Sequence, residues 1–68
     1  MNEDNLNMEI RKFLKKVGIT SKRIIEKHIY NAEKNGDIKS GDEIDLEMTL
    51  TIKNFQSSDT IKSKILID

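Results

Sequence analysis

The chain has 68 residues, with twelve basic and twelve acidic side chains, a single histidine and no cysteine. A chain this short predicts one domain over residues 1–68, and without cysteine it has neither a disulfide nor a thiolate metal site. It lacks the run of about 18 apolar residues that crosses a bilayer, and its acidic start Met1–Asp4 does not fit a secretory signal, so we expect a cytoplasmic protein with no membrane partner.

The zero net charge conceals an uneven distribution along the chain. Residues 1–7 carry two acids, residues 8–34 carry eight bases and three acids, and residues 35–68 carry seven acids and four bases. The sequence therefore predicts a basic helical half and an acidic half made of strands, an asymmetry that can attract partners or a second copy.

A first helix is predicted over residues 3–16. Asn2 or Asn5 can cap its start, and its apolar residues share one face: Leu6, Ile10, Phe13, Leu14 and Val17. Gly18 then fits the position where many helices end, because glycine accepts a left-handed backbone.

A second helix is predicted over residues 21–35. Thr20 or Ser21 precedes a new apolar run and is interpreted as its cap rather than as a nucleophile, and Gly36 is expected to end it. Its apolar face holds Ile24, Ile25, His28, Ile29 and Ala32. Two helices joined by a short glycine-containing link predict an αα-hairpin or a helix-turn-helix-like corner.

The apolar period changes from helical to alternating after residue 42, which predicts two strands over residues 43–53 and 60–67. The acids Asp42, Glu43, Asp45 and Glu47 alternate with apolar residues, so they are interpreted as the solvated side of a strand rather than as a calcium loop. Opposite charges favour a register with Glu47 opposite Lys64, and a register with Thr49 opposite Lys64 is the alternative.

The predicted fold is α+β in the order α-α-β-β, with a two-helix hairpin packed on an antiparallel β-hairpin. Its expected core is Leu6, Ile10, Phe13, Leu14, Val17, Ile25, Ile29, Ala32, Leu46, Met48, Leu50, Ile61, Ile65 and Ile67. A two-stranded sheet leaves two open edges, so a homodimer formed through a hairpin edge strand is one alternative and a monomer with charged, protected edges is the other.

One surface is a candidate for binding. Basic and aromatic residues of the second predicted helix form it, at Lys22, Arg23, Lys27, Tyr30 and Lys34. A helix-turn-helix protein would use such residues on nucleic acid. Against this, the overall charge is not basic, a third helix is not predicted, and Glu26 and Glu33 interrupt the set.

Catalytic and metal sites are not indicated. His28 has no carboxylate at a suitable spacing, so Ser21, two turns earlier on the same side, lacks the acid that would complete a catalytic set. Gly18, Gly36 and Gly41 form no phosphate-binding loop. We therefore expect no enzyme activity and no cofactor.

The N-terminal residues carry a resemblance to a known family. Met1–Asp4, Ile10–Lys15 and Val17–Ser21, with Asn7, Met8 and Glu26, resemble a small family of uncharacterised bacterial proteins about seventy residues long, a domain of unknown function. The resemblance implies no activity or site. The best-supported expectation is a small interaction module that binds an unknown protein or itself, and the alternative is a nucleic-acid-binding helix-turn-helix variant.

Overall fold

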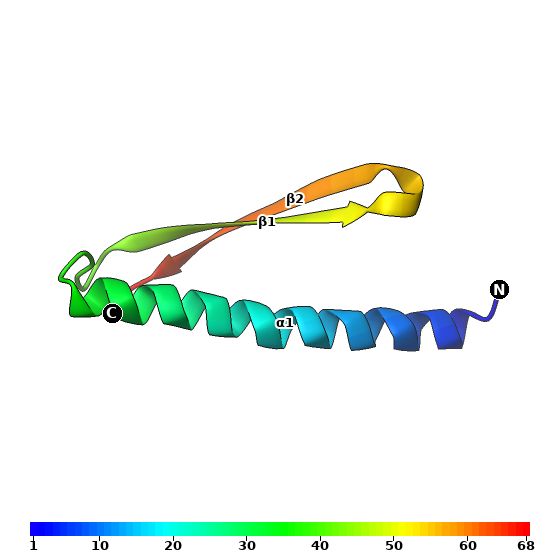
Figure 1. Ribbon diagram of the computed structural model, residues 1–68, viewed down its shortest axis with the longest axis horizontal. Coiled ribbons are helices and arrows are strands. Elements are labelled where there is room, and N and C mark those ends of the chain that lie inside the picture. Colours follow the sequence, from blue (N-terminus) through cyan, green and yellow to red (C-terminus); the bar gives the residue numbers. More distant parts are fainter. The chain divides into compact units, whose positions relative to one another are not determined.

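The computed structural model describes all residues 1–68, in the order α1 (Glu3–Lys34), β1 (Glu43–Ile52), a short 3-10 helix (Lys53–Phe55) and β2 (Ser57–Leu66). Contacts within the chain divide it into two units, Met1–Asp37 and Ile38–Asp68. The α+β class is confirmed, but the two-helix hairpin is wrong because residues 3–34 form one helix without interruption (Figure 1). The expectation of a single domain over residues 1–68 stays a prediction.

Both ends of α1 follow the sequence prediction. The side chain of Asn2 accepts a hydrogen bond from the backbone N–H of Asn5 at 3.1 Å, as a helix cap does. At the other end Gly36 has a φ of 73°, and the N–H of Asp37 donates to the carbonyl of Ala32 at 2.8 Å. The N–H of Gly36 also donates to the carbonyl of Glu33 at 3.1 Å, so the two hydrogen bonds satisfy carbonyls in the last turn of the helix. Such an end requires a residue in the left-handed conformation, which explains the glycine.

The predicted break at Gly18 does not occur because the apolar residues on its two sides keep the same helical phase. Leu6 and Ile24, Ile10 and His28, and Leu14 and Ala32 are each separated by eighteen residues, which is about five full turns of an α-helix. One straight helix therefore gathers both predicted faces into a single face. Thr20 and Ser21, predicted as caps, lie inside α1 instead.

Gly18 destabilises this helix and can be improved. A Cβ built at Gly18 meets nothing within 4 Å, and the φ of this residue is not positive. Because glycine in a helix interior costs about 1 kcal/mol relative to alanine, we expect Gly18→Ala to raise the free energy of unfolding by about that amount. Thermal unfolding followed by circular dichroism at 222 nm checks it, and a lower melting temperature for the variant would contradict it.

The hairpin is antiparallel, and its register differs from both registers considered. Glu47 lies opposite Lys62, and Asp45 lies opposite Lys64. Acids of β1 therefore lie opposite lysines of β2, as predicted, but the partner of Glu47 is two residues away from the predicted one. The displacement arises because β2 begins at Ser57, three residues before the predicted start, which shortens the connection to four residues.

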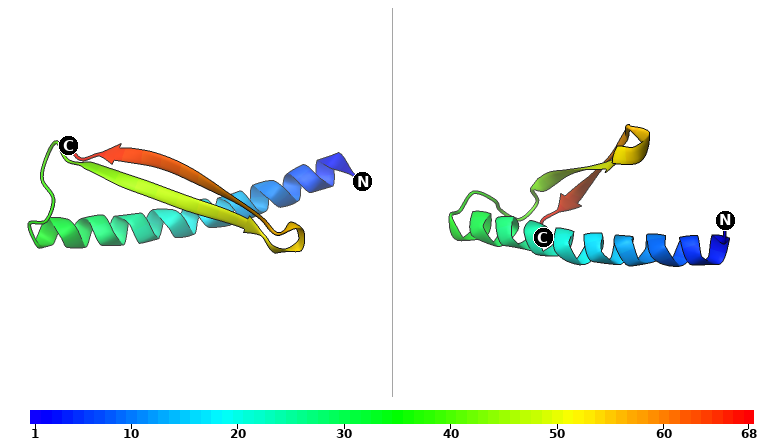
Figure 2. Two further views of the ribbon diagram at one scale, coloured as in Figure 1. Left: turned by 90° about the horizontal axis from the view of Figure 1, so that it is seen from above. Right: turned by 45° about the vertical axis from the view of Figure 1, so that its right-hand side comes forward.

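The two faces of the hairpin match the alternating pattern. The register places Ile44 opposite Ile65 and Met48 opposite Ile61, so one face is largely apolar. On the other face Thr49 and Thr60 are joined through their hydroxyls at 3.1 Å. The strands twist about each other along their length, as the views in Figure 2 show, which is the usual twist of a two-stranded ribbon.

The loop of the hairpin contains a strained residue. Gln56 has φ 52° and ψ 35°, a left-handed conformation that costs a non-glycine residue about 1–2 kcal/mol. We expect Gln56→Gly to raise the free energy of unfolding by up to about 1 kcal/mol and Gln56→Val to lower it by a similar amount. Urea unfolding of the two variants measures the difference, and equal midpoints would contradict the assignment.

The predicted core is wrong for both units. No residue of the chain is buried, neither apolar nor polar. A lone helix and a lone two-stranded sheet each have one apolar face and nothing of their own to cover it. The consequence is that the side chains expected in a core form accessible surfaces.

Candidate functional site

The candidate binding residues of the sequence all lie in the second half of α1, and all are exposed. They do not form one cluster. At about 100° per residue, Arg23, Lys27 and Lys34 follow one side of the helix, whereas Lys22 lies well away from that side.

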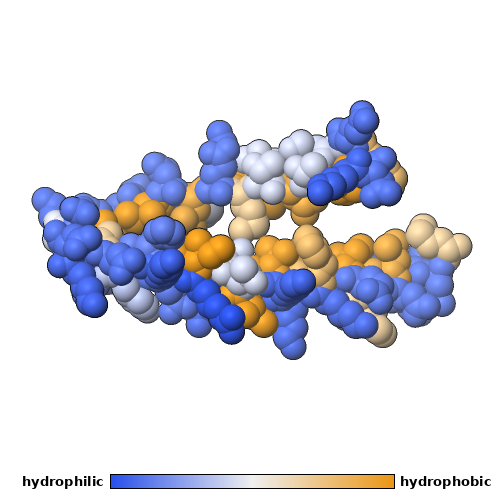
Figure 3. Space-filling view, viewed as in Figure 1, coloured by the Kyte–Doolittle hydropathy of each residue, from blue (hydrophilic) through white to orange (hydrophobic).

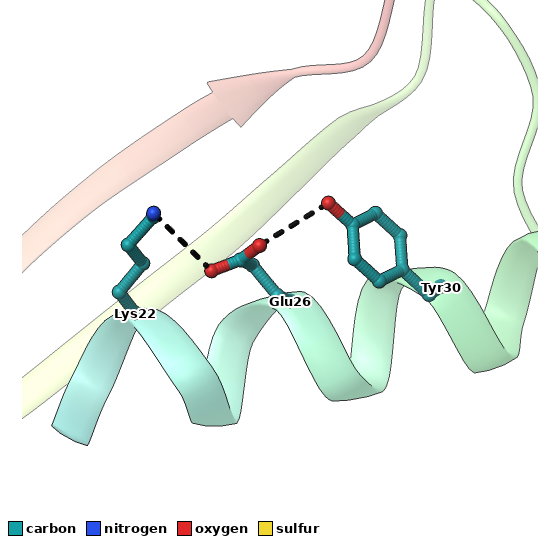
Figure 4. Close-up of polar contacts among 3 residues, drawn as sticks. All are labelled: Lys22, Glu26 and Tyr30. Carbon is teal, nitrogen blue, oxygen red and sulfur yellow. Dashed lines mark hydrogen bonds and ion pairs between the residues drawn. The ribbon is translucent and has the colours of Figure 1, made fainter. Parts of the chain in front are cut away.

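Glu26 organises the residues nearest to it. Its carboxylate lies 3.7 Å from the ammonium of Lys22 and accepts a hydrogen bond of 3.2 Å from the hydroxyl of Tyr30 (Figure 4). The three residues are spaced by four, which places them one above another on the helix surface. Lys22 and Tyr30 therefore both contact the carboxylate of Glu26. Each such exposed contact contributes only a few tenths of a kcal/mol to the stability of the helix.

The remaining three basic residues have no acidic partner. Arg23, Lys27 and Lys34 form no ion pair within 4 Å, whereas Lys12 lies 3.7 Å from Glu9. Lys16 belongs to the same side of the helix by its spacing. The single helix thus aligns Lys16, Arg23, Lys27 and Lys34 in one row, which we call the basic row.

Another candidate surface is apolar. The apolar face of α1 consists of Leu6, Ile10, Phe13, Leu14, Val17, Ile24, Ile25, His28, Ile29 and Ala32. Several of its large side chains are about half exposed, including Phe13 at 53%, Leu14 at 52% and Ile24 at 53%. Figure 3 shows hydrophobic residues gathered along one side of this helix. A contiguous apolar surface of this kind is typical of a protein-binding site.

The hairpin contributes a second apolar face and two open edges. Met48, Leu50, Ile52 and Ile61 are between 38% and 66% exposed. On the opposite face Lys64 lies 3.4 Å from Glu43 and 3.9 Å from Asp45, so the charges of the two strands pair within the hairpin. The acids of β1 are thus on the solvated side of a strand, as predicted.

The structure shows no assembled catalytic or metal-binding group. His28 takes part in no hydrogen bond or ion pair of the structure. No group of three or more His, Asp or Glu side chains is placed so that it could hold a metal ion. The depression lined by Lys12, Lys15, Lys16, Ile19 and Thr20 is shallow and lies on the surface of a single helix.

Sequence reasoning missed two features of these surfaces. It treated Glu26 only as an interruption, although the spacing of Lys22, Glu26 and Tyr30 by four residues indicates the contacts seen here. It also divided the apolar face in two, although the eighteen-residue repeat across Gly18 shows one face.

These observations define a small α+β protein with a long amphipathic helix, a twisted β-hairpin and accessible apolar faces. The chain belongs to DUF6494, a family of unknown function whose model matches residues 1–68, which confirms the resemblance noted in the sequence. No curated protein and no solved structure matched the chain. α1 lacks the density of apolar residues that a bilayer-crossing helix needs.

Proposed function

We propose that this protein is a small, non-enzymatic protein-interaction module. The observation that carries the proposal is the apolar face of α1, which extends over the whole helix while no side chain of the chain is buried. Covering such a face removes apolar surface from water, and this is the main favourable term in protein association. The compartment stays the sequence-based prediction of a cytoplasmic protein.

A pull-down tests this function in the native cell. The tagged chain is compared with a Phe13→Lys variant, which places a charge on the apolar face, and with an Ile19→Lys variant, which changes a comparably exposed residue elsewhere on α1. We expect the wild type and Ile19→Lys to retain a stoichiometric protein, either an untagged copy of the chain or another protein, and Phe13→Lys to lose it. Retention of nothing by the wild type would contradict the proposal.

Nucleic-acid binding is the second candidate, and the basic row supports it. A helix with four aligned basic residues, and no acid on that side between Lys16 and Lys34, can follow a phosphate backbone. The helix-turn-helix corner on which the sequence hypothesis depended is absent, so a groove-reading mode of that type has lost its basis. Duplex binding that weakens steeply with salt and is lost in an Arg23→Glu, Lys27→Glu double variant would favour this candidate.

A further inference from the structure

We propose that the partner of the apolar face of α1 is a second copy of the same chain, bound in antiparallel orientation. This inference rests on the proposed interaction function and names its partner. Three observations carry it: the face is complementary to itself, the charges beside it suit opposite orientations, and the alternative route through the sheet edges brings like charges together.

The first observation is the order of residues along the face. An antiparallel pair with its two-fold axis near Ile19 places Ile10 level with His28 of the other copy, Leu14 level with Ile24, and Val17 level with Ser21. In the pair formed by Leu14 and Ile24 the two residues lie on opposite sides of the face. They therefore pack side by side between the helices instead of meeting end to end, as knobs packing into holes require.

The length of α1 makes this arrangement extensive. A continuous helix of 32 residues is about 48 Å long at 1.5 Å per residue. Two-fold symmetry repeats every apolar layer on the other side of the axis, so the face is used from Leu6 to Ala32 on both copies. With a break at Gly18 only half of this surface would be presented in one line.

The second observation is the charge beside the face. Glu9 lies on the same margin of the apolar face as Lys27 and Lys34, and like margins meet in an antiparallel pair. At the level set by the apolar layers Glu9 falls between Lys27 and Lys34 of the second copy, neither of which has an acidic partner within its own chain. A parallel pair would instead bring the acidic first turns, with Glu3 and Asp4, together and align the two helix dipoles.

The third observation concerns the sheet edges, which the sequence suggested as the dimer contact. A symmetric antiparallel pair through β1 centred on Asp45 would set Glu43 opposite Glu47 and Asp45 opposite its own copy, and a pair through β2 centred on Ser63 would set Lys62 opposite Lys64. Like charges across neighbouring strands are destabilising. The helix face carries no such penalty at its centre, where Val17 lies level with Ser21 and no residue is charged.

Distance measurement between spin labels tests the orientation. Because the chain has no cysteine, Asn5→Cys gives one nitroxide label per copy near the start of α1, away from the apolar face. An antiparallel pair separates the two labels by about 40 Å, whereas a parallel pair keeps them within about 20 Å. A label at Ile19→Cys, level with the two-fold axis but on the outer side of α1, gives a similar distance of about 20 Å in either orientation and therefore reports whether pairs form.

Charge reversal provides a second test that spares the apolar residues. We expect Glu9→Lys to raise the dissociation constant of the pair about tenfold, since two contacts between the copies are lost and two repulsions arise per dimer. The same substitution also removes the exposed ion pair with Lys12 within each chain. Addition of Lys27→Glu to the same chain should restore the affinity. Glu33→Lys makes the same charge change away from the face and should leave the affinity unaltered, with all values taken from sedimentation equilibrium.

The outcomes separate this inference from the proposed function. A short Asn5 distance overturns the antiparallel arrangement. A wild-type chain that sediments as a monomer at high micromolar concentration overturns self-pairing altogether, while a different protein retained in the pull-down would still support the interaction function. Long Asn5 distances together with restoration by Lys27→Glu establish the proposal.

Discussion

Replacement of Leu14 by lysine is expected to abolish pairing through α1 and to reduce its helicity. Burial of a leucine side chain contributes about 1.5–3 kcal/mol, and a symmetric dimer contains two such positions. A loss of about 3–6 kcal/mol corresponds to a rise of more than about a hundredfold in the dissociation constant. Helicity falls with it, because a single helix without a covered face is marginal in water.

Ile19→Lys is the matched control for this variant. Leu14 and Ile19 are 52% and 47% exposed in the single chain. If the chain had no partner, a lysine at either position would change stability and helicity by similar amounts. Ile19 points away from the apolar face. We therefore expect the Ile19→Lys variant to have the sedimentation behaviour and the ellipticity at 222 nm of the wild type. Equal behaviour of the two variants would show that the apolar face has no partner.

Gly18→Pro is expected to have the second large effect. Proline inside a helix removes one backbone hydrogen bond and clashes with the preceding turn, at a cost of about 3 kcal/mol or more. If Gly18 instead ended one helix in a left-handed conformation, proline would be strained there as well, and Gly18→Ala would lower the stability, because a Cβ disfavours that backbone. The continuous helix thus predicts a large loss of stability for Gly18→Pro together with a gain for Gly18→Ala, whereas a left-handed cap predicts a loss for both substitutions.

Circular dichroism and sedimentation measure this effect together. We expect Gly18→Pro to lower the ellipticity at 222 nm and to weaken the pair, while Gly18→Ala at the same position raises both stability and ellipticity. An unchanged ellipticity in the proline variant would contradict the continuous helix. Gly18→Ala changes the same residue. If any substitution of Gly18 lowered the ellipticity, the alanine variant would show the loss as well.

The ends of α1 could be predicted from sequence because local chemistry decides them. Asn2 and Gly36 satisfy orphan backbone groups by their own side chain or backbone, and no distant residue is needed. Gly18 carries the same local signal as Gly36, but it is followed by a helix-compatible segment in the correct phase. The outcome there depends on the whole apolar face, which a local pattern of glycine, threonine and serine does not contain.

The hairpin shows the same division between pattern and geometry. The alternation from Ile44 to Ile52 identified β1 and its apolar face, because side chains of a strand alternate with a period of two. The register depended on the loop, where Gln56 takes a left-handed conformation. Glutamine is not a residue type that indicates such a turn position, as glycine or asparagine would be. Opposite charges such as Glu47 and Lys62 restrict the register but do not fix it, since several pairings satisfy them.

The candidate surfaces followed only in part from the sequence. The basic residues at Arg23, Lys27 and Lys34 are exposed as expected, but their alignment with Lys16 depends on helix continuity. The expected core failed for a physical reason: amphipathic residues identify which face avoids water, not what covers it. The sequence therefore indicated which residues form the apolar face, but it did not indicate which surface covers that face.

Backbone chemical shifts of residues 15–22 test the central claim, that one helix with one apolar face extends through Gly18. We predict Cα shifts displaced in the helical direction at every position from Lys15 to Lys22, with no interruption at Gly18 or Ile19. Extended or random-coil shifts at Gly18 and Ile19, flanked by helical values, would show two helices and would contradict the account.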